Sequence, residues 1–161
     1  MARRSRRSRR KPYKVVKYSN ETQDFSDTLP ATPNAKLNMQ ATMVPALNVQ
    51  GMRKCKNFTL QIITTSRIPI TFALVYVPQG TTPSALSFGS PGAPLSMYEP
   101  NQNVIMSGTV IDGSAQQTWR TRLARNLNSG DYIALVLGTA DNFNVSAEPA
   151  ISVTFNYAIT Y

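Results

Sequence analysis

The last eleven residues of the chain alternate between large apolar side chains and small or polar ones. Ile151, Val153, Phe155, Tyr157, Ile159 and Tyr161 share one face, and Ser152, Thr154, Asn156, Ala158 and Thr160 share the other. A period of two is typical of a β-strand with one buried and one solvated face, and it does not fit a helix. The segment therefore predicts a strand of an antiparallel sheet that packs on a core through one face.

The same pattern recurs upstream, between turn-forming residues. The predicted strands are residues 37–43, 58–63, 70–77, 104–110, 117–123 and 132–137, with a short additional strand at 95–98. Residues 70–77 are apolar on both faces, which predicts a strand in the middle of a sheet with cover on each side. About eight strands joined by loops of uneven length favour a jelly roll over an up-and-down barrel. The predicted fold class is all-β: a single eight-stranded antiparallel jelly roll.

The first seventeen residues carry the whole net charge of +9. Their basic residues, with no acid among them, are Arg3, Arg4, Arg6, Arg7, Arg9, Arg10, Lys11, Lys14 and Lys17. Residues 18–161 hold the remaining 17 − 9 = 8 Lys and Arg and all 8 Asp and Glu, so their formal charge is zero. The basic segment has no apolar periodicity and repels itself, so we expect it to stay disordered until a polyanion binds it.

These features divide the chain into three parts. Residues 1–18 are the expected basic arm, residues 19–35 a polar tether with two prolines, and residues 36–161 the jelly-roll domain. Within the domain, residues 78–102 form a long loop with five prolines and three glycines, and a loop of this length in a small domain is usually functional. Its apolar residues predict a contact surface with another subunit: Leu86, Phe88, Leu95, Met97 and Tyr98.

The composition argues against an enzyme and against a metal or cofactor site. The chain has no histidine, which removes the usual general base and most zinc sites. Cys55 is the single cysteine, and we expect it to be a small buried or edge residue, with Lys54 and Lys56 on the opposite strand face. The acids are scattered, and none are spaced to pair on one strand face. The longest apolar runs have six residues, too few for a membrane span.

The arginine-rich arm predicts a nucleic-acid partner, bound through its phosphates and not by reading bases. A nuclear-import signal alone and a solubility tail are the alternatives for such a run. Arg120, Arg122 and Arg125 form either a second phosphate-binding patch or a solvated sheet face. Alternation places Arg120 and Arg122 opposite Trp119 and Leu123, so the arginines point away from the core if those two point toward it.

Two segments of the domain resemble the capsid proteins of small circular single-stranded DNA viruses, the CRESS-DNA group. They are Tyr98-Glu-Pro-Asn-Gln-Asn-Val-Ile-Met-Ser-Gly108 and Arg122-Leu-Ala-Arg-Asn-Leu-Asn-Ser-Gly-Asp131, and Val77-Pro-Gln-Gly-Thr-Thr-Pro-Ser-Ala-Leu86 fits the same pattern. The resemblance implies a jelly roll in a shell of sixty copies, with the arm inside on single-stranded DNA. It also implies a virion protein that enters the host nucleus through the import machinery, with Arg3 to Lys11 as the import signal.

Two other classes of protein remain open at this point. A satellite-type RNA virus capsid would have the same fold and the same task, because an arm that tracks phosphates does not distinguish DNA from RNA. A non-viral nucleic-acid-binding β-barrel would act as a monomer or dimer. The body lacks the basic face with interleaved aromatic residues that such a barrel uses.

Overall fold

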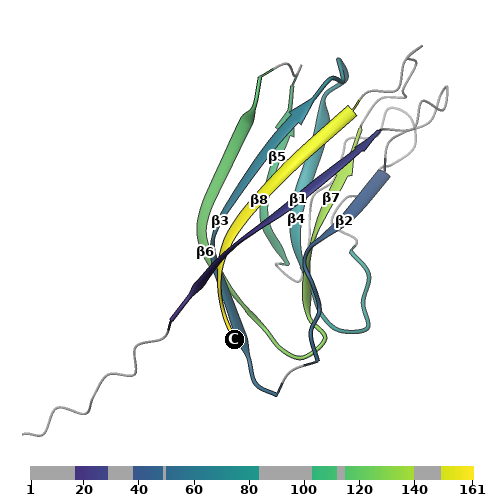
Figure 1. The fold of residues 1–161 in the computed structure, drawn as a ribbon. Coiled ribbons are helices and arrows are strands. Elements are labelled where there is room, and N and C mark those ends of the chain that lie inside the picture. Colours follow the sequence, from purple (N-terminus) through teal and green to yellow (C-terminus); the bar gives the residue numbers. More distant parts are fainter. Residues whose placement is uncertain (1–16, 29–37, 49, 84–102, 112–114, 140–149) are drawn as a thin grey trace, which may run out of the picture.

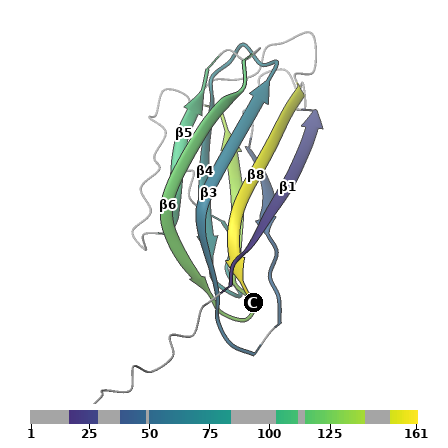
Figure 2. The same ribbon diagram turned by 60° about the vertical axis from the view of Figure 1, so that its left-hand side comes forward.

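The fold is a sandwich of two four-stranded sheets. The computed structural model describes residues 17–28, 38–48, 50–83, 103–111, 115–139 and 150–161. The strands in this part of the chain are β1 (Ser19–Thr28), β2 (Asn38–Val44), β3 (Arg53–Thr64), β4 (Ile70–Val77), β5 (Val104–Val110), β6 (Gln117–Leu127), β7 (Tyr132–Gly138) and β8 (Ala150–Thr160). One sheet has the order β1-β8-β3-β6 and the other β2-β7-β4-β5, and they lie face to face (Figures 1 and 2). We call them the first and the second sheet.

The order of the strands is that of a jelly roll. Every pairing is antiparallel, and β1 lies beside β8, so the first and last strands of the chain are neighbours. Successive strands lie in alternate sheets except for β4 and β5, which pair within the second sheet. The predicted all-β jelly roll is thus confirmed. Among the described residues, no helix is long and apolar enough to cross a membrane.

The core fills the space between the two sheets. Alternate residues of β3 and β8 point into it, and Phe58 stacks on Phe155 with ring centroids 5.9 Å apart. Phe72 of the second sheet contacts Trp119 of β6 in an edge-to-face arrangement, with ring centroids 4.7 Å apart. Offset and edge-to-face contacts of this kind are favourable arrangements of aromatic quadrupoles. The first pair packs within the first sheet, and the second joins the two sheets along the β6 side.

A second, smaller apolar cluster covers the other face of the second sheet. It consists of Ala73, Val75, Val77, Ala134 and Val136, all nearly inaccessible to solvent, with Val104 and Tyr132 packed against them. These residues alternate with the core residues of β4 and β7, so both strands are buried on both faces. The prediction that residues 70–77 form a central strand with cover on each side is confirmed.

The first strand corrects the predicted boundary of the domain. Residues 19–28 were expected to belong to a tether, but they pair with β8 along their whole length. As an edge strand β1 exposes most of its side chains, and Phe25 is the apolar residue that packs on the core, so the sequence shows no alternation. Its backbone hydrogen bonds and a few contacts hold it, and composition does not reveal those. The rest of the expected tether, residues 29–35, lies outside the described residues.

Strand β6 corrects a second expectation. Trp119 packs on the core as predicted and is half-buried, whereas Leu123 is 48% exposed. The cause is an interruption of the pairing with β3: Phe58 faces Thr121 and Lys56 faces Ala124, so Arg122 and Leu123 have no partner in the register. Alternation alone could not reveal this irregularity. The short strand predicted at 95–98 lies outside the described residues.

Candidate nucleic-acid interface

The described chain begins at the base of the basic arm. Lys17 is exposed and lies two residues before the start of β1, and residues 1–16, with the other eight basic residues of the arm, lie outside the described residues. Tyr18 is fixed to the first sheet, because the Lys56 ammonium lies 3.6 Å from the centroid of its ring. This cation–π contact places the end of the arm against the outer face of the first sheet.

On the core side of the first sheet, two tyrosine hydroxyl groups and one carboxylate hold the start of β1 in place. Tyr157 donates a hydrogen bond of 2.6 Å to Glu21 Oε2, and Tyr161 donates one of 2.5 Å to Glu21 Oε1. Burial and the bond to Glu21 raise the pKa of Tyr157, and the bond to Glu21 with burial raises the pKa of Tyr161 to about 12. Both tyrosines therefore remain protonated donors at neutral pH. They tie the first strand to the last just after the arm ends.

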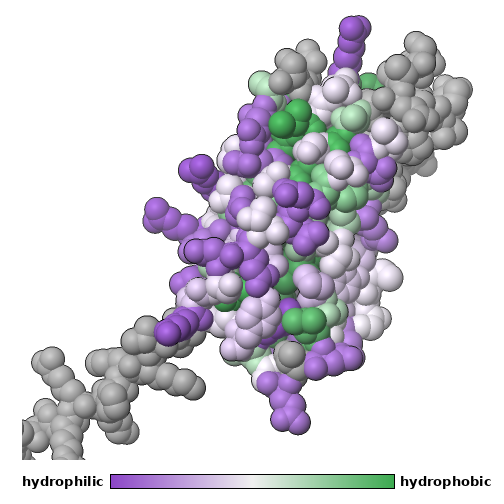
Figure 3. Space-filling model, in the orientation of Figure 1, coloured by the Kyte–Doolittle hydropathy of each residue, from purple (hydrophilic) through white to green (hydrophobic). Residues whose placement is uncertain are grey.

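The outer face of the first sheet is polar, and its cations gather on β3 and β6. Thr22, Asn156, Thr59 and Arg120 lie side by side across the four strands, and Asn20, Ala158, Lys56 and Ala124 form a parallel row. Figure 3 shows this face: hydrophilic and pale residues dominate, and the apolar ones form separate patches. We call Lys54, Lys56, Arg120 and Arg122 the basic strip.

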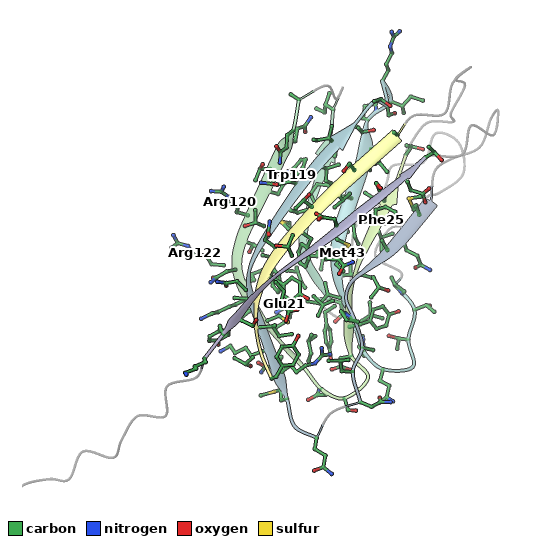
Figure 4. All side chains as sticks on the ribbon, viewed as in Figure 1. Glu21, Phe25, Met43, Trp119, Arg120 and Arg122 are labelled. Atoms are coloured by element: carbon green, nitrogen blue, oxygen red, sulfur yellow. The ribbon has the colours of Figure 1, made fainter. Side chains whose placement is uncertain are left out.

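The two arginines of β6 lie where the sequence predicts. Arg120 and Arg122 are exposed, and both side chains extend away from the sandwich (Figure 4). Arg125 does not join them. It is half-buried on the core side of β6, opposite the buried Cys55. Of the three arginines considered from the sequence, two therefore share a surface and the third belongs to the other face of the strand.

A hollow of about 480 Å³ opens between the two rows, where β3 and β6 lose their register. Its lining consists of Asn57, Phe58, Thr59, Arg120, Thr121 and Arg122. Asn57 has a φ of 57° and faces no residue of β6 or β8 in the register. Asparagine tolerates this left-handed conformation better than most residues. Asn57 was not among the predicted site residues, although an asparagine in an otherwise β-forming segment was the available signal.

The donors in this hollow suit an anion. Two arginines, two threonines and one asparagine line it together with Phe58, and none of these residues is acidic. Guanidinium groups bind phosphate oxygens with paired, charge-assisted hydrogen bonds. The arrangement can therefore hold a phosphate group, whereas it offers no general base.

Cys55, the remaining candidate for a reactive side chain, is unsuited to nucleophilic chemistry. Cys55 is fully buried, as expected, and burial raises the pKa of its thiol to about 12, so the nucleophilic thiolate does not form at neutral pH. A search of the described residues finds no group of three His, Cys, Asp or Glu side chains placed to hold a metal ion.

The predicted subunit contacts belong to a part of the chain that the structure does not describe. Leu86, Phe88, Leu95, Met97 and Tyr98 are outside the described residues, so their role stays a prediction. The described part of the chain exposes other large apolar side chains that sequence reasoning did not select: Leu47, Met52, Ile63, Ile111, Leu123 and Tyr161. Single exposed apolar residues are common on protein surfaces and do not by themselves mark an interface.

Comparison with known proteins yields distant structural matches. The solved structure of Desmodium yellow mottle tymovirus matches at 13% identity and a TM-score of 0.40, covering 97% of this chain and 94% of that chain. The CBM36-1 domain of a multidomain xylanase from the hindgut metagenome of Trinervitermes trinervoides matches at 11% identity and a TM-score of 0.38, covering 86% and 96%. At these TM-scores neither match supports an inference about function. No protein-family model matches the chain, and no curated protein matches it.

Proposed function

We propose that this protein is a viral capsid protein that assembles into a shell and packages single-stranded DNA through its basic arm. The observation that carries the proposal is the separation of charge: +9 on residues 1–17 and zero on the remainder, which folds as a jelly roll. The jelly roll is an architecture used by viral capsids, as well as by lectin domains and cupins. The fold alone therefore does not distinguish a capsid protein from a lectin domain or a cupin. The distribution of charge favours the capsid protein.

The separation of charge serves both tasks of such a protein. A body without net charge lets many copies pack together without mutual repulsion, while the arms neutralise the nucleic acid and release its counterions. Sixty copies, the number that the resemblance implies, would carry about 540 positive charges on their arms (60 × 9). That is a sizeable fraction of the charge of a genome of roughly one to two thousand nucleotides.

The folded body supports the same arrangement. Tyr18, at the base of the arm, lies against the face that carries the basic strip, so the arm and the strip act on one side of the domain. The only acid on the same outer face of the described first sheet is Asp24, which lies on β1, at the edge opposite β6. We infer that this face looks toward the packaged nucleic acid. The arm would also direct the protein to the host nucleus before assembly.

Deleting residues 2–17 tests the proposal. The truncated protein should still fold, because no residue of either apolar cluster is lost. It should lose most of its co-purifying nucleic acid and its nuclear accumulation. A full-length variant with Arg3, Arg4, Arg6, Arg7, Arg9 and Arg10 replaced by Gln is the matched control, since it removes charge and keeps length.

The measurement is the ratio of absorbance at 260 and 280 nm of the purified protein, followed by DNase and RNase digestion of the extracted nucleic acid. Loss of nucleic acid in both variants, with DNA in the wild type from infected cells, agrees with the proposal. If both variants retained it at the wild-type ratio, the arm would not be the binding element. Extraction of RNA alone would favour an RNA virus capsid.

A further inference from the structure

We propose that the hollow between β3 and β6 is a binding seat for one phosphodiester group of the nucleic-acid strand, at the point where the strand leaves the arm and meets the folded body. This inference rests on the proposed function and adds a defined site to it. Arg120 and Arg122 supply its positive charge, and Asn57, Thr59 and Thr121 are the polar residues that line it beside them.

The seat is built by the local backbone and not by surface charge alone. Asn57 takes a φ of 57°, and two successive residues of β6, Arg122 and Leu123, have no partner on β3. The loss of pairing leaves a concave surface on a sheet that would otherwise be evenly pleated. One hydrogen bond stabilises the irregular part of β6, because the Leu123 amide donates to Thr121 Oγ1 at 3.2 Å. The two arginines therefore line a hollow that the local backbone creates.

The surroundings select an anion. The residues that line the hollow carry two positive charges and no negative one. Asp24 on β1 belongs to the row of outward residues that continues through Thr154 and Gln61 to Thr118 on β6. This row is next to the one that holds Arg120, so Asp24 is three strands away from Arg120 and one row along. Three strand spacings are about 14 Å, more than the Debye length at physiological salt. The described chain thus places no carboxylate where it would compete with a bound phosphate.

The position of the seat indicates that its ligand is a strand and not a small anion. Lys56 directly precedes Asn57 in β3, and its ammonium lies over the ring of Tyr18 at the end of the arm. Lys56 and Asn20 flank the same residue of β8, Ala158, so the start of β1 lies two strand spacings, about 10 Å, from Lys56, which is next to the seat in β3. A strand bound by the arm therefore reaches Lys56 first and the two arginines next.

Photo-crosslinking of the full-length protein to a 4-thiothymidine-substituted single-stranded DNA of about twenty nucleotides tests this inference. Mapping of the crosslinked peptides by mass spectrometry should give crosslinks in the arm and, separately, in residues 57–59 and 120–122. The variant Arg120→Gln/Arg122→Gln should lose the second group and keep the first. Arg67→Gln is the matched control, because Arg67 is an exposed arginine on the turn between β3 and β4, beyond the far end of the seat.

The salt dependence of binding to the same DNA gives a second readout. Each lost contact with a single-strand phosphate lowers the slope of log Kobs against log salt by about 0.7, so the double variant should lose up to about 1.4 and Arg67→Gln nothing. Inorganic phosphate at millimolar concentration should compete poorly with the DNA at the seat. Effective competition would mean a site for a small anion.

The outcomes separate this inference from the proposed function. Crosslinks in the arm alone, with an unchanged slope for the double variant, would refute the seat and leave the proposed function intact. Crosslinks in neither region would refute both. If the double variant bound DNA normally and failed to assemble, the two arginines would belong to a contact between copies of the chain.

Discussion

The outer faces of the two sheets differ in the residue types that they carry, and the jelly-roll topology does not require this difference. On the first sheet the outward residues of β8 and β3 are mostly Ser, Thr, Asn, Gln and Lys, with Ala158 and Ile63 among them, and two arginines follow on β6. On the second sheet the outward residues of β4 and β7 are Ala73, Val75, Val77, Ala134 and Val136, and all are buried. Each sheet contributes its other face to one common core. The domain therefore has a solvated, cationic side and an apolar, covered side.

The difference shows how one small domain separates two tasks. A polar face with clustered guanidinium groups attracts a polyanion without a large cost in desolvation. A sheet buried on both faces gives rigid packing instead. The side that carries the arm is the polar one, because Tyr18 and Lys56 lie on it. We expect nucleic acid on the first sheet and protein contacts on the second.

The largest effect on stability is expected from a charge placed on the outer face of the second sheet. Val75 is 2% exposed, so Val75→Asp would bury a carboxylate without a partner and lower the free energy of unfolding by about 3–5 kcal/mol. The matched change on the first sheet is Thr118→Glu, at an exposed outward position, with an expected change within about 0.5 kcal/mol. Urea unfolding of both variants checks the contrast. Equal effects would show that the two faces do not differ as described.

A smaller effect is expected where an aromatic pair joins the sheets. Trp119→Ala removes the edge-to-face contact with Phe72, and because the indole is half-buried we expect a loss of about 3 kcal/mol, the lower end for a buried aromatic residue. Gly108 leaves room for the pair, since a Cβ there would lie 2.8 Å from Phe72 Cε1 and from Trp119 Nε1. Gly108→Ala should therefore destabilise as well, and Trp119→Phe much less than Trp119→Ala. Wild-type melting temperatures for Trp119→Ala and Gly108→Ala would contradict this packing.

A second link between the sheets lies at the opposite end and depends on a buried carboxylate. The Arg53 guanidinium of the first sheet donates to the backbone carbonyls of Pro45 and Asp131, both at 3.1 Å. The Asp131 carboxylate accepts hydrogen bonds from Tyr76 Oη at 2.6 Å and from the backbone amides of Asn128 and Gln79. Burial alone would raise the pKa of Asp131, but these bonds outweigh it and hold the pKa below its usual value.

Asp131→Asn should lower the free energy of unfolding at pH 7 by about 2 kcal/mol, because the amide cannot accept all three hydrogen bonds. The folded pKa is depressed, so the stability from ionised Asp131 is full above the unfolded value of about 3.9 and is lost as pH falls through the folded value. Urea unfolding at pH 7 and at pH 3 measures both effects. We expect the difference between wild type and variant to shrink at pH 3, and a constant difference would assign the loss to packing.

The sequence predicted those parts of the molecule in which side chains alternate regularly. The alternation predicts the burial of residues 151–157, the continuous apolar run predicts that of residues 70–77, and Arg120 points outward by the rule of alternation. The rule fails where burial or register is decided by neighbouring strands. Phe25 is the apolar residue that ties β1 to the core, and the break in pairing that exposes Leu123 and opens the hollow depends on three strands together. The sequence therefore predicted the two arginines of the seat but not the hollow between them.

Sedimentation velocity of the purified full-length protein, before and after nuclease treatment, tests the central claim most directly. Sixty copies of a 17.7 kDa chain have a protein mass of about 1.1 MDa. We expect a single fast component of at least that mass which absorbs strongly at 260 nm and withstands nuclease, because the shell encloses the nucleic acid. A monomer or dimer at micromolar concentration in moderate salt, or a complex that nuclease reduces to such species, would contradict the account.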